Sequence, residues 1–273
     1  MRRMIAFACA GETLFGTLDE GAGQSGLLII SGGNEIRSGS HRGMARLAQQ
    51  TAAELGVPVF RYDRRGVGDS TGANQGFEHS AQDIAAAAAT FAAEVPGMRR
   101  IVAFGNCDAA TALALFHGAA GIDALLIANP WTIEQSAASD LPHAAAIRAR
   151  YAERLKDPRE WLRLLRGGVN IGKVLKGIGK VIGSRTGPAA AASPDSLAAR
   201  LGAALGSAQV PVTLLIARRD NTAIAFMDAW KGEAFAAART AITPVERDTA
   251  SHSFAGPGDE AWLFDRVKDA LGG

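Results

Sequence analysis

The stretch 103-AFGNCDAATALALF-116 decides the fold of this chain. It starts as an apolar strand pattern, turns at Gly105–Ala109, and continues as a helix of small residues. The turn reads G-x-C-x-A, which is the G-x-S-x-G nucleophile elbow with cysteine replacing serine and alanine replacing the second glycine. Cys107 is therefore predicted at the apex of a strand-turn-helix unit. Because single buried cysteines are often inert core residues, a purely structural role for Cys107 is the alternative.

Short apolar runs recur on both sides of this unit, with helical patterns between them. This alternation predicts βαβ units, and so an α/β fold with a mostly parallel central sheet and helices on both faces. Upstream, 4-MIAFACAGETLFGTLDE-20 is typical of an antiparallel hairpin that turns near Gly11 and adds an edge to the sheet. The parallel strands are predicted in 26-GLLIISGG-33, 57-VPVFRYDRRG-66, 99-RRIVAFGN-106, 123-DALLIANPW-131, 210-VPVTLLIARRD-220 and 243-TPVERDTASHSF-254.

Two covering helices are well marked in the sequence. One lies within residues 40–56 and ends at Gly56, and the other follows Ser80 as N-cap and stops before Pro96. The strand-helix alternation breaks over residues 132–209, where amphipathic helical patterns and an Ala-Ser-Pro linker occur. We therefore expect a single domain over residues 1–273 with a helical lid insertion at 132–209. A peripheral helical decoration without a gating role is the alternative.

Composition excludes several classes of protein. The chain has 273 residues, is 48% hydrophobic and carries a net charge of +2, without a basic stripe for nucleic acid. Its two cysteines and five histidines show no metal-ligand spacing, so we expect no metal and no cofactor. The apolar run after Arg3 is shorter than a signal peptide needs, and no stretch approaches the roughly 20 residues of a membrane span. With two free thiols, the expectation is a soluble cytoplasmic protein.

Partners for a Cys107 nucleophile follow later in the chain. His252 comes just after the last strand-like run, where it could act as the base. Asp220 ends a strand at its carboxyl end, where catalytic groups of open α/β sheets collect. The order nucleophile, acid, histidine is one of the known triad orders. Asp248 is the competing acid, because it is closer to His252 in the sequence. Among the other histidines, His117 is expected to have a structural role, and His79 and His143 are expected on the surface or in the lid insertion.

An acyl-transfer site also needs hydrogen-bond donors for the oxyanion. The backbone N–H of Asp108 follows the nucleophile directly, and a second N–H is expected from Gly33 or Asn34 in the loop after 26-GLLIISGG-33. No G-x-G-x-x-G or Walker pattern follows this loop, so we reject a nucleotide site.

Two further features accompany the predicted sheet. In 62-YDRRGVGDSTG-72, Asp63, Arg65 and Ser70 are expected to stabilise the loop by hydrogen bonds and ion pairs, with direct substrate contact as the alternative. Trp131 could line an acyl pocket, and simple packing explains it equally well.

Several of these motifs together resemble the α/β-hydrolase superfamily. More narrowly, they resemble the exosortase A system-associated hydrolase of the first type, which is found in bacterial exopolysaccharide loci. The resemblance implies an α/β-hydrolase fold with Cys107 as nucleophile, Asp220 as acid and His252 as base, and it implies that His41 lies near the site. Ala109 departs from the common elbow glycine. The motifs are the cysteine elbow 105-GNCDAA-110, 31-SGGNEIRSGSHRG-43, 60-FRYDRRGVGDSTG-72, 129-NPW-131 and 251-SHSF-254.

These features favour a cysteine-dependent acyl hydrolase, either an esterase or a thioesterase, or an acyltransferase, acting on a small ester or thioester. A catalytically silent scaffold protein of a polysaccharide assembly is the alternative. In 171-IGKVLKGIGKVIG-183, apolar residues share one face and lysines lie off it, which suits lid packing better than contact with a membrane surface. The sequence leaves the oligomeric state open.

Overall fold

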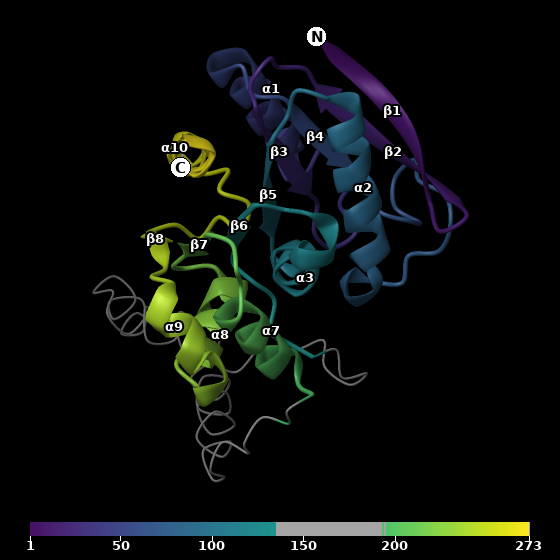
Figure 1. The fold of residues 1–273 in the computed structure, drawn as a ribbon. Helices are drawn as coiled ribbons and strands as arrows, with labels where there is room; N and C mark the ends of the chain where they lie inside the picture. The colour runs from purple at the N-terminus through teal and green to yellow at the C-terminus, as the bar shows by residue number, and fades with distance from the viewer. Residues whose placement is uncertain (135–192, 194, 273) are drawn as a thin grey trace, which may run out of the picture.

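One sheet organises the part of the chain that the computed structural model describes, residues 1–134, 193 and 195–272 (Figure 1). Eight strands of this part form it, in the order β1-β2-β4-β3-β5-β6-β7-β8. All neighbours from β4 to β8 are parallel, whereas β1 and β2 pair antiparallel at one edge. The strands are β1 Arg2–Cys9, β2 Glu12–Asp19, β3 Ser25–Ile30, β4 Val59–Tyr62, β5 Arg100–Asn106, β6 Ala124–Ala128, β7 Val212–Ala217 and β8 Val245–Arg247.

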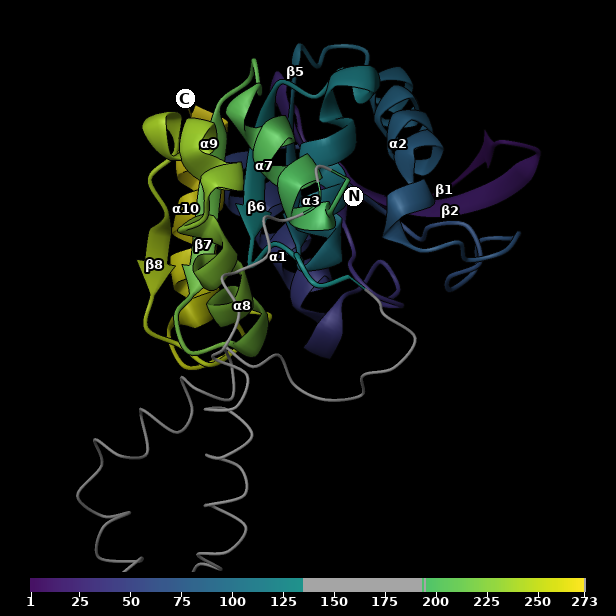
Figure 2. The same cartoon turned by 90° about the horizontal axis from the view of Figure 1, so that it is seen from below.

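Helices cover both faces of this sheet (Figure 2). Side chains of α1 and α10 pack against one face, and those of α2, α3, α7 and α8 pack against the other. Four single-turn 3₁₀ helices join these elements within the described residues. The α-helices are α1 Gly43–Leu55, α2 Ala81–Glu94, α3 Asp108–Phe116, α7 Leu197–Gly206, α8 Asn221–Trp230, α9 Ala236–Ala241 and α10 Asp259–Gly272, and the 3₁₀ helices are η1 Ser40–Arg42, η2 Phe77–His79, η3 His117–Ala120 and η4 Glu233–Phe235.

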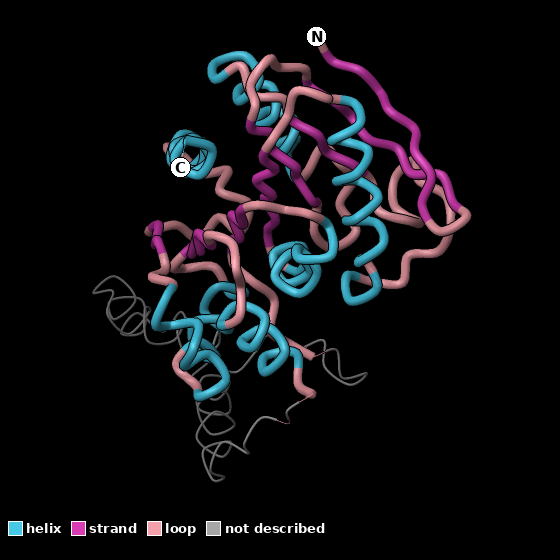
Figure 3. Tube along the Cα trace, in the orientation of Figure 1, coloured by secondary structure: helices cyan, strands magenta, loops and turns pink. Residues whose placement is uncertain are grey.

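The strand predictions are confirmed, because each apolar run contains one strand of the sheet (Figure 3). The hairpin also forms as predicted, with Cys9 opposite Glu12. Ala10 and Gly11 connect them with φ angles of 51° and 84°. Two successive positive φ angles fit the right-handed twist of the hairpin strands.

The helix boundaries agree with the sequence except in two local details. Gly56 ends α1 in a left-handed conformation, as expected for a glycine after a helix. Ser80 does stand at the N-cap of α2, but its hydroxyl makes no capping bond and donates to the carbonyl of Phe77 at 2.6 Å instead. Before α1, His41 and Arg42 adopt left-handed φ angles of 51° and 58°, which the sequence does not reveal.

The predicted insertion at 132–209 falls largely outside the described residues. Residues 135–192 and 194 belong to this undescribed part, and the lysine-bearing segment 171–183 lies within it. At its end, α7 begins at Leu197 after the N-cap Ser196, whose hydroxyl accepts a hydrogen bond from Ala199 N–H at 3.2 Å. This helix packs against α3 and α9. The lid role and the single-domain boundaries remain predictions. Within the described residues, no helix has both the length and the apolar composition of a membrane span.

Candidate active site

The elbow places Cys107 in a strained backbone position between β5 and α3. Its φ and ψ angles are 63° and −127°, a region that side chains other than glycine rarely adopt. Its backbone N–H donates to the carbonyl of Ala128 at 3.0 Å, and its carbonyl accepts the N–H of Trp131 at 3.2 Å. The turn is therefore fixed to the end of β6, and the thiol remains partly exposed.

Close packing of the elbow explains its small residues. A Cβ atom added at Gly105 would lie 2.9 Å from backbone atoms of Ala109 and from a methyl group of Leu113. Such contacts are shorter than real side chains show, so the strand requires glycine at this position. Ala109 is itself buried against the strand, which agrees with the small residues expected from the sequence.

Asp220 and His252 meet at the carboxyl ends of the strands. Asp220 is the N-cap of α8, and its Oδ2 accepts hydrogen bonds from His252 Nδ1 at 2.9 Å and from Ala223 N–H at 3.1 Å. The competing acid, Asp248, is exposed and pairs with Arg219 at 3.1 Å and Arg218 at 3.5 Å. The structure therefore brings Asp220 to the histidine, while Asp248 pairs with these arginines.

The electrostatic surroundings of His252 favour its protonated form. Burial lowers the pKa of the imidazole, but side-chain hydrogen bonds with Asp220 and with Cys107 outweigh this effect and raise the pKa to about 10. The imidazolium form of His252 is thus favoured by its two side-chain partners, Asp220 and Cys107. An imidazolium at this position can supply a proton to a leaving group.

Two asparagines hydrogen-bond to the backbone of the loop that carries His252, here called the histidine loop. Neither was singled out from the sequence. Asn106, just before Cys107, and Asn129, just after β6, each donate from Nδ2 to the carbonyl of His252 at 3.1 Å. Asn129 also donates to Oδ1 of Asn106 at 3.0 Å and accepts the N–H of Ala217 at 2.8 Å. Asn129 is fully buried with a φ of 44°, a left-handed angle that asparagine tolerates better than most residues. The ends of β5, β6 and β7 are thereby joined to the histidine loop.

Replacing Asn129 with alanine is expected to misplace His252. We expect kcat to fall about 10- to 100-fold with little change in KM, because small displacements of a reacting group are costly. The orphaned Ala217 N–H should also lower the free energy of unfolding by about 1–3 kcal/mol. Steady-state kinetics and thermal melts measure both effects.

Asp123→Ala is the matched control for this stability loss. Its carboxylate accepts the N–H of Ile101 at 2.7 Å at the opposite end of β5, far from the elbow in the strand. A similar fall in kcat in this control, or an unchanged kcat in Asn129→Ala, would contradict a positioning role for Asn129.

A cavity of about 130 Å³ opens beside the nucleophile. Cys107 and His252 lie on its wall, and the loop after β3 forms the other side. Much of the lining surface is apolar, and Glu35 contributes a carboxylate to it. The remaining lining residues are Ile30, Ser31, Gly32, Gly33, Met44, Asn106 and Ser253.

The predicted oxyanion donors differ in their availability. The backbone N–H groups of Asp108 and Asn34 have no acceptor among the described residues. The N–H of Gly33, by contrast, donates to Oδ1 of Asp108 at 2.6 Å. The expected donor on Gly33 is thus covered by the side chain of the residue that follows the nucleophile.

His41 and Trp131 are not among the described residues that line this cavity. His41 lies in the strained turn before α1, where its carbonyl accepts a hydrogen bond from Arg46 at 2.9 Å. The Trp131 indole donates to the carbonyl of Ile133 at 2.6 Å, and its ring packs on the core. A role in the substrate pocket remains a prediction for both residues.

The loop after β4 has the structural contacts that the sequence indicates. The carboxylate of Asp63 is buried and accepts the N–H of Arg37 at 2.5 Å, while the Ser70 hydroxyl donates to the Asp63 carbonyl at 2.7 Å. Arg65 pairs with Asp83 at 2.5 Å. The expected stabilising role of these loop residues is confirmed.

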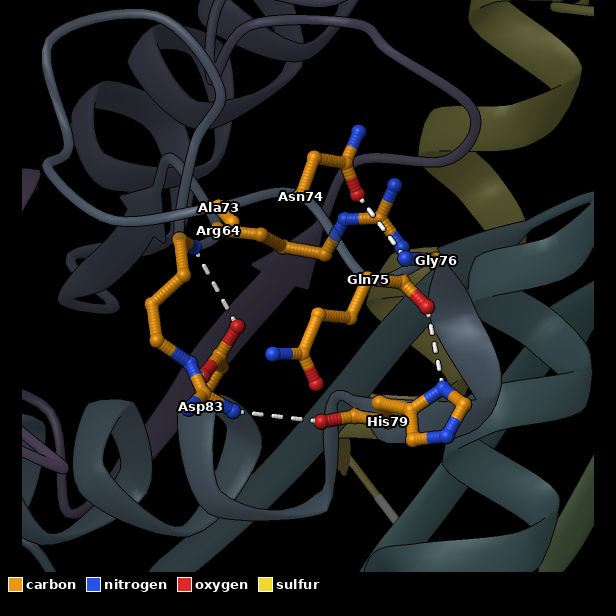
Figure 4. Close-up of a pocket in the computed structure, with 8 residues that line it drawn as sticks. Arg64, Ala73, Asn74, Gln75, Gly76, His79 and Asp83 are labelled. Carbon is orange, nitrogen blue, oxygen red and sulfur yellow. Dashed lines mark hydrogen bonds and ion pairs between the residues drawn. The ribbon is translucent and has the colours of Figure 1, made fainter.

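Arg64 in the same loop is a residue that the sequence did not single out. Figure 4 shows its side chain lying beside Asn74 and Gly76, where it helps to line a small polar cavity. His79 lies on the same cavity and hydrogen-bonds through Nδ1 with the carbonyl of Gln75 at 2.9 Å. His117 makes similar contacts with carbonyls of the preceding helix α3, in agreement with its predicted structural role. His143 lies outside the described residues.

In the described part of the chain, no group of three or more His, Cys, Asp or Glu side chains is arranged so that it could bind a metal ion.

Comparisons with known proteins concern the family and the fold of the chain. A family profile described as the alpha/beta hydrolase family matches residues 27–263. A search of curated protein sequences finds no match. Among solved structures, the chain is similar to an esterase from Pyrococcus furiosus at 16% identity, with a TM-score of 0.65 over 100% of this chain and 91% of the other.

Two further solved structures share the fold. The thioesterase domain of the curacin biosynthetic pathway is 14% identical, with a TM-score of 0.58 over 98% of this chain and 99% of the other. A serine hydrolase without a lid from Xanthomonas campestris is also 14% identical, with a TM-score of 0.55 over 99% and 93% of the two chains. At such identities, the likeness describes the architecture of the chain.

Proposed function

Because the chain belongs to the alpha/beta hydrolase family, we propose that it is an acyl hydrolase or acyltransferase with Cys107 as its nucleophile. The observation that carries the proposal is the hydrogen bond from His252 Nδ1 to Asp220 at 2.9 Å, on a histidine whose other partner is Cys107. Esterases and a thioesterase among the structural neighbours support an ester or thioester substrate.

Acylation begins when the thiolate of Cys107 attacks the carbonyl carbon of the substrate. The carbonyl oxygen becomes an oxyanion that accepts hydrogen bonds from backbone N–H groups of Asp108 and of the loop after β3. When the intermediate collapses, the bond to the leaving group breaks and the His252 imidazolium protonates the departing alcohol or thiol. The acyl group is then held as a thioester on Cys107, and His252 is neutral.

Deacylation reverses these roles. Neutral His252 removes a proton from water or from an acceptor hydroxyl, and the resulting oxygen attacks the thioester carbonyl. The thiolate of Cys107 leaves, and the imidazolium forms again beside Asp220. Because a thioester transfers readily to an alcohol, the same steps serve hydrolysis and acyl transfer.

The biological setting is a further part of the proposal. The resemblance to exosortase A system-associated hydrolases supports a place in bacterial exopolysaccharide or envelope metabolism. A saccharide hydroxyl is then a natural acceptor. Both cysteines, Cys9 and Cys107, are free, which fits a reducing cytoplasm.

A screen of esters and acyl thioesters tests this function. We expect release of alcohol or thiol above the buffer rate for at least one donor, and added saccharide acceptors separate transfer from hydrolysis. No release across a broad panel of acyl lengths would contradict an enzyme and favour a scaffold protein with the same fold.

A further inference from the structure

The side chain of Asp108 occupies a donor that the reaction needs. Its Oδ1 accepts the Gly33 N–H at 2.6 Å, and this N–H is one of the groups expected to bind the oxyanion. Its Oδ2 lies 4.0 Å from Nη1 of Arg64, a long contact for an ion pair. The Asp108 carboxylate is thus hydrogen-bonded to the Gly33 amide and makes only a long contact with the Arg64 guanidinium.

Arg64 binds the carbonyl side of Gly33, whose N–H side is bound by Asp108. Its Nη2 donates to the carbonyl of Gly33, and its side chain is only 6% exposed. Among the described residues, Asp108 is the acidic partner of Arg64. A buried guanidinium with one distant carboxylate would gain from a shorter ion pair.

Glycine at position 32 permits this approach. A Cβ atom built on Gly32 would lie 2.6 Å from Oδ1 of Asp108 and 2.6 Å from the carbonyl of Asn106. Any other residue would displace either the carboxylate or the elbow strand. The contact between Asp108 and the glycine loop is therefore built into the backbone of both segments.

We propose that Asp108 is a gate on the oxyanion hole, closed when its carboxylate lies on Gly33 and open when the carboxylate turns to Arg64. This inference rests on the proposed function of Cys107. In the closed position, the carboxylate accepts the Gly33 N–H, so this donor does not serve the negative oxygen that forms in the reaction. In the open position, a shorter ion pair with Arg64 replaces the hydrogen bond to Gly33, and both donors face the substrate.

Asp108→Ala removes the gate and is expected to raise the single-turnover rate of Cys107 acylation about 10-fold or more, since one oxyanion donor is worth about 10²–10³ in rate. Asp108→Asn is the matched control, because it loses the charge but keeps an oxygen that can accept the Gly33 N–H. We expect its acylation rate to stay at or below that of the native protein. Asp108→Ser, whose hydroxyl is one bond shorter, replaces the alanine variant if that variant does not fold.

Alkylation of Cys107 by iodoacetamide supplies the second readout, because this reaction forms no oxyanion. The gate predicts that the ratio of acylation to alkylation rates rises in Asp108→Ala and does not rise in Asp108→Asn. An equal rise in both variants would assign the effect to charge alone, and no rise or a fall in Asp108→Ala would show that the contact supports the site; either result overturns the gate.

The two proposals fail in different ways. If the native protein acylates and Asp108→Ala is no faster, the gate is wrong and the nucleophile stands. If the native protein is silent and Asp108→Ala acylates on Cys107, the gate is supported in its strongest form. If neither protein forms an adduct, both proposals are overturned.

Discussion

Cys107→Ala is expected to lower kcat/KM for ester or thioester turnover on the order of 10⁴–10⁶-fold, as loss of a nucleophile does in triad enzymes. The thiol is the group that forms the bond to the acyl carbon, and no neighbouring side chain replaces it at the apex of the elbow. Steady-state kinetics on the donors found in the ester and thioester screen measure the loss.

Cys107→Ser is expected to remain nearly inactive at neutral pH. A hydroxyl is a weaker nucleophile than a thiolate and must lose its proton to a neutral histidine as it attacks. Because the hydrogen bond to Asp220 raises the pKa of His252, the neutral imidazole becomes more abundant as the pH rises, and activity of the serine variant should increase in the same direction. Native-like turnover in the serine or the alanine variant at pH 7 would remove Cys107 from the mechanism.

Cys9→Ala is the matched control for these variants. Cys9 is buried in β1, and burial together with a hydrogen bond to Asp83 raises the pKa of its thiol to about 11. It is therefore protonated at assay pH and lies in the core. We expect unchanged kcat with a lower melting temperature in this variant.

Asp220→Ala is expected to lower kcat/KM roughly 10³–10⁴-fold, because the histidine loses the group that orients and charges it. The pH profile should change as well. With burial still lowering the pKa of His252 and the Asp220 hydrogen bond gone, the pKa falls from about 10. Since acylation uses the imidazolium, the alkaline limb of the kcat/KM profile should move from near pH 10 to lower pH.

Two controls separate this effect from loss of structure. Asp220→Asn can keep the N-cap contact to Ala223 while removing the charge, so it should show the same shift in the pH profile with a smaller loss of stability. Asp248→Ala removes the exposed carboxylate next to the arginines and should leave the profile unchanged. If Asp248→Ala moved the alkaline limb and Asp220→Ala did not, the acid would be misassigned.

Local patterns account for what the sequence predicted about the fold. Short apolar runs mark each parallel strand, and the elbow sequence itself encodes the strand-turn-helix unit around Cys107. These features depend on residues that are adjacent in the chain, so one sequence is enough to find them. The pairing of His252 with Asp220, rather than with Asp248, followed from strand order in an open α/β sheet.

Contacts between distant segments could not be predicted in the same way. Asn106 and Asn129 are unremarkable as sequence, and their meeting on the carbonyl of His252 depends on how three strands end side by side. The position of the Asp108 carboxylate on Gly33 likewise depends on a side-chain rotamer across 75 positions of sequence. Ser80 stands at the N-cap as predicted, but the bond from its hydroxyl to the carbonyl of Phe77 depends on the folded turn before α2.

Mass spectrometry of the protein quenched during turnover tests the central claim most directly. The account predicts a mass increase equal to the acyl group, located on the peptide that contains Cys107, absent in Cys107→Ala and retained in Cys9→Ala. Product formation with the acyl group on another residue, or with no adduct at Cys107 under any quench time or donor, would contradict it.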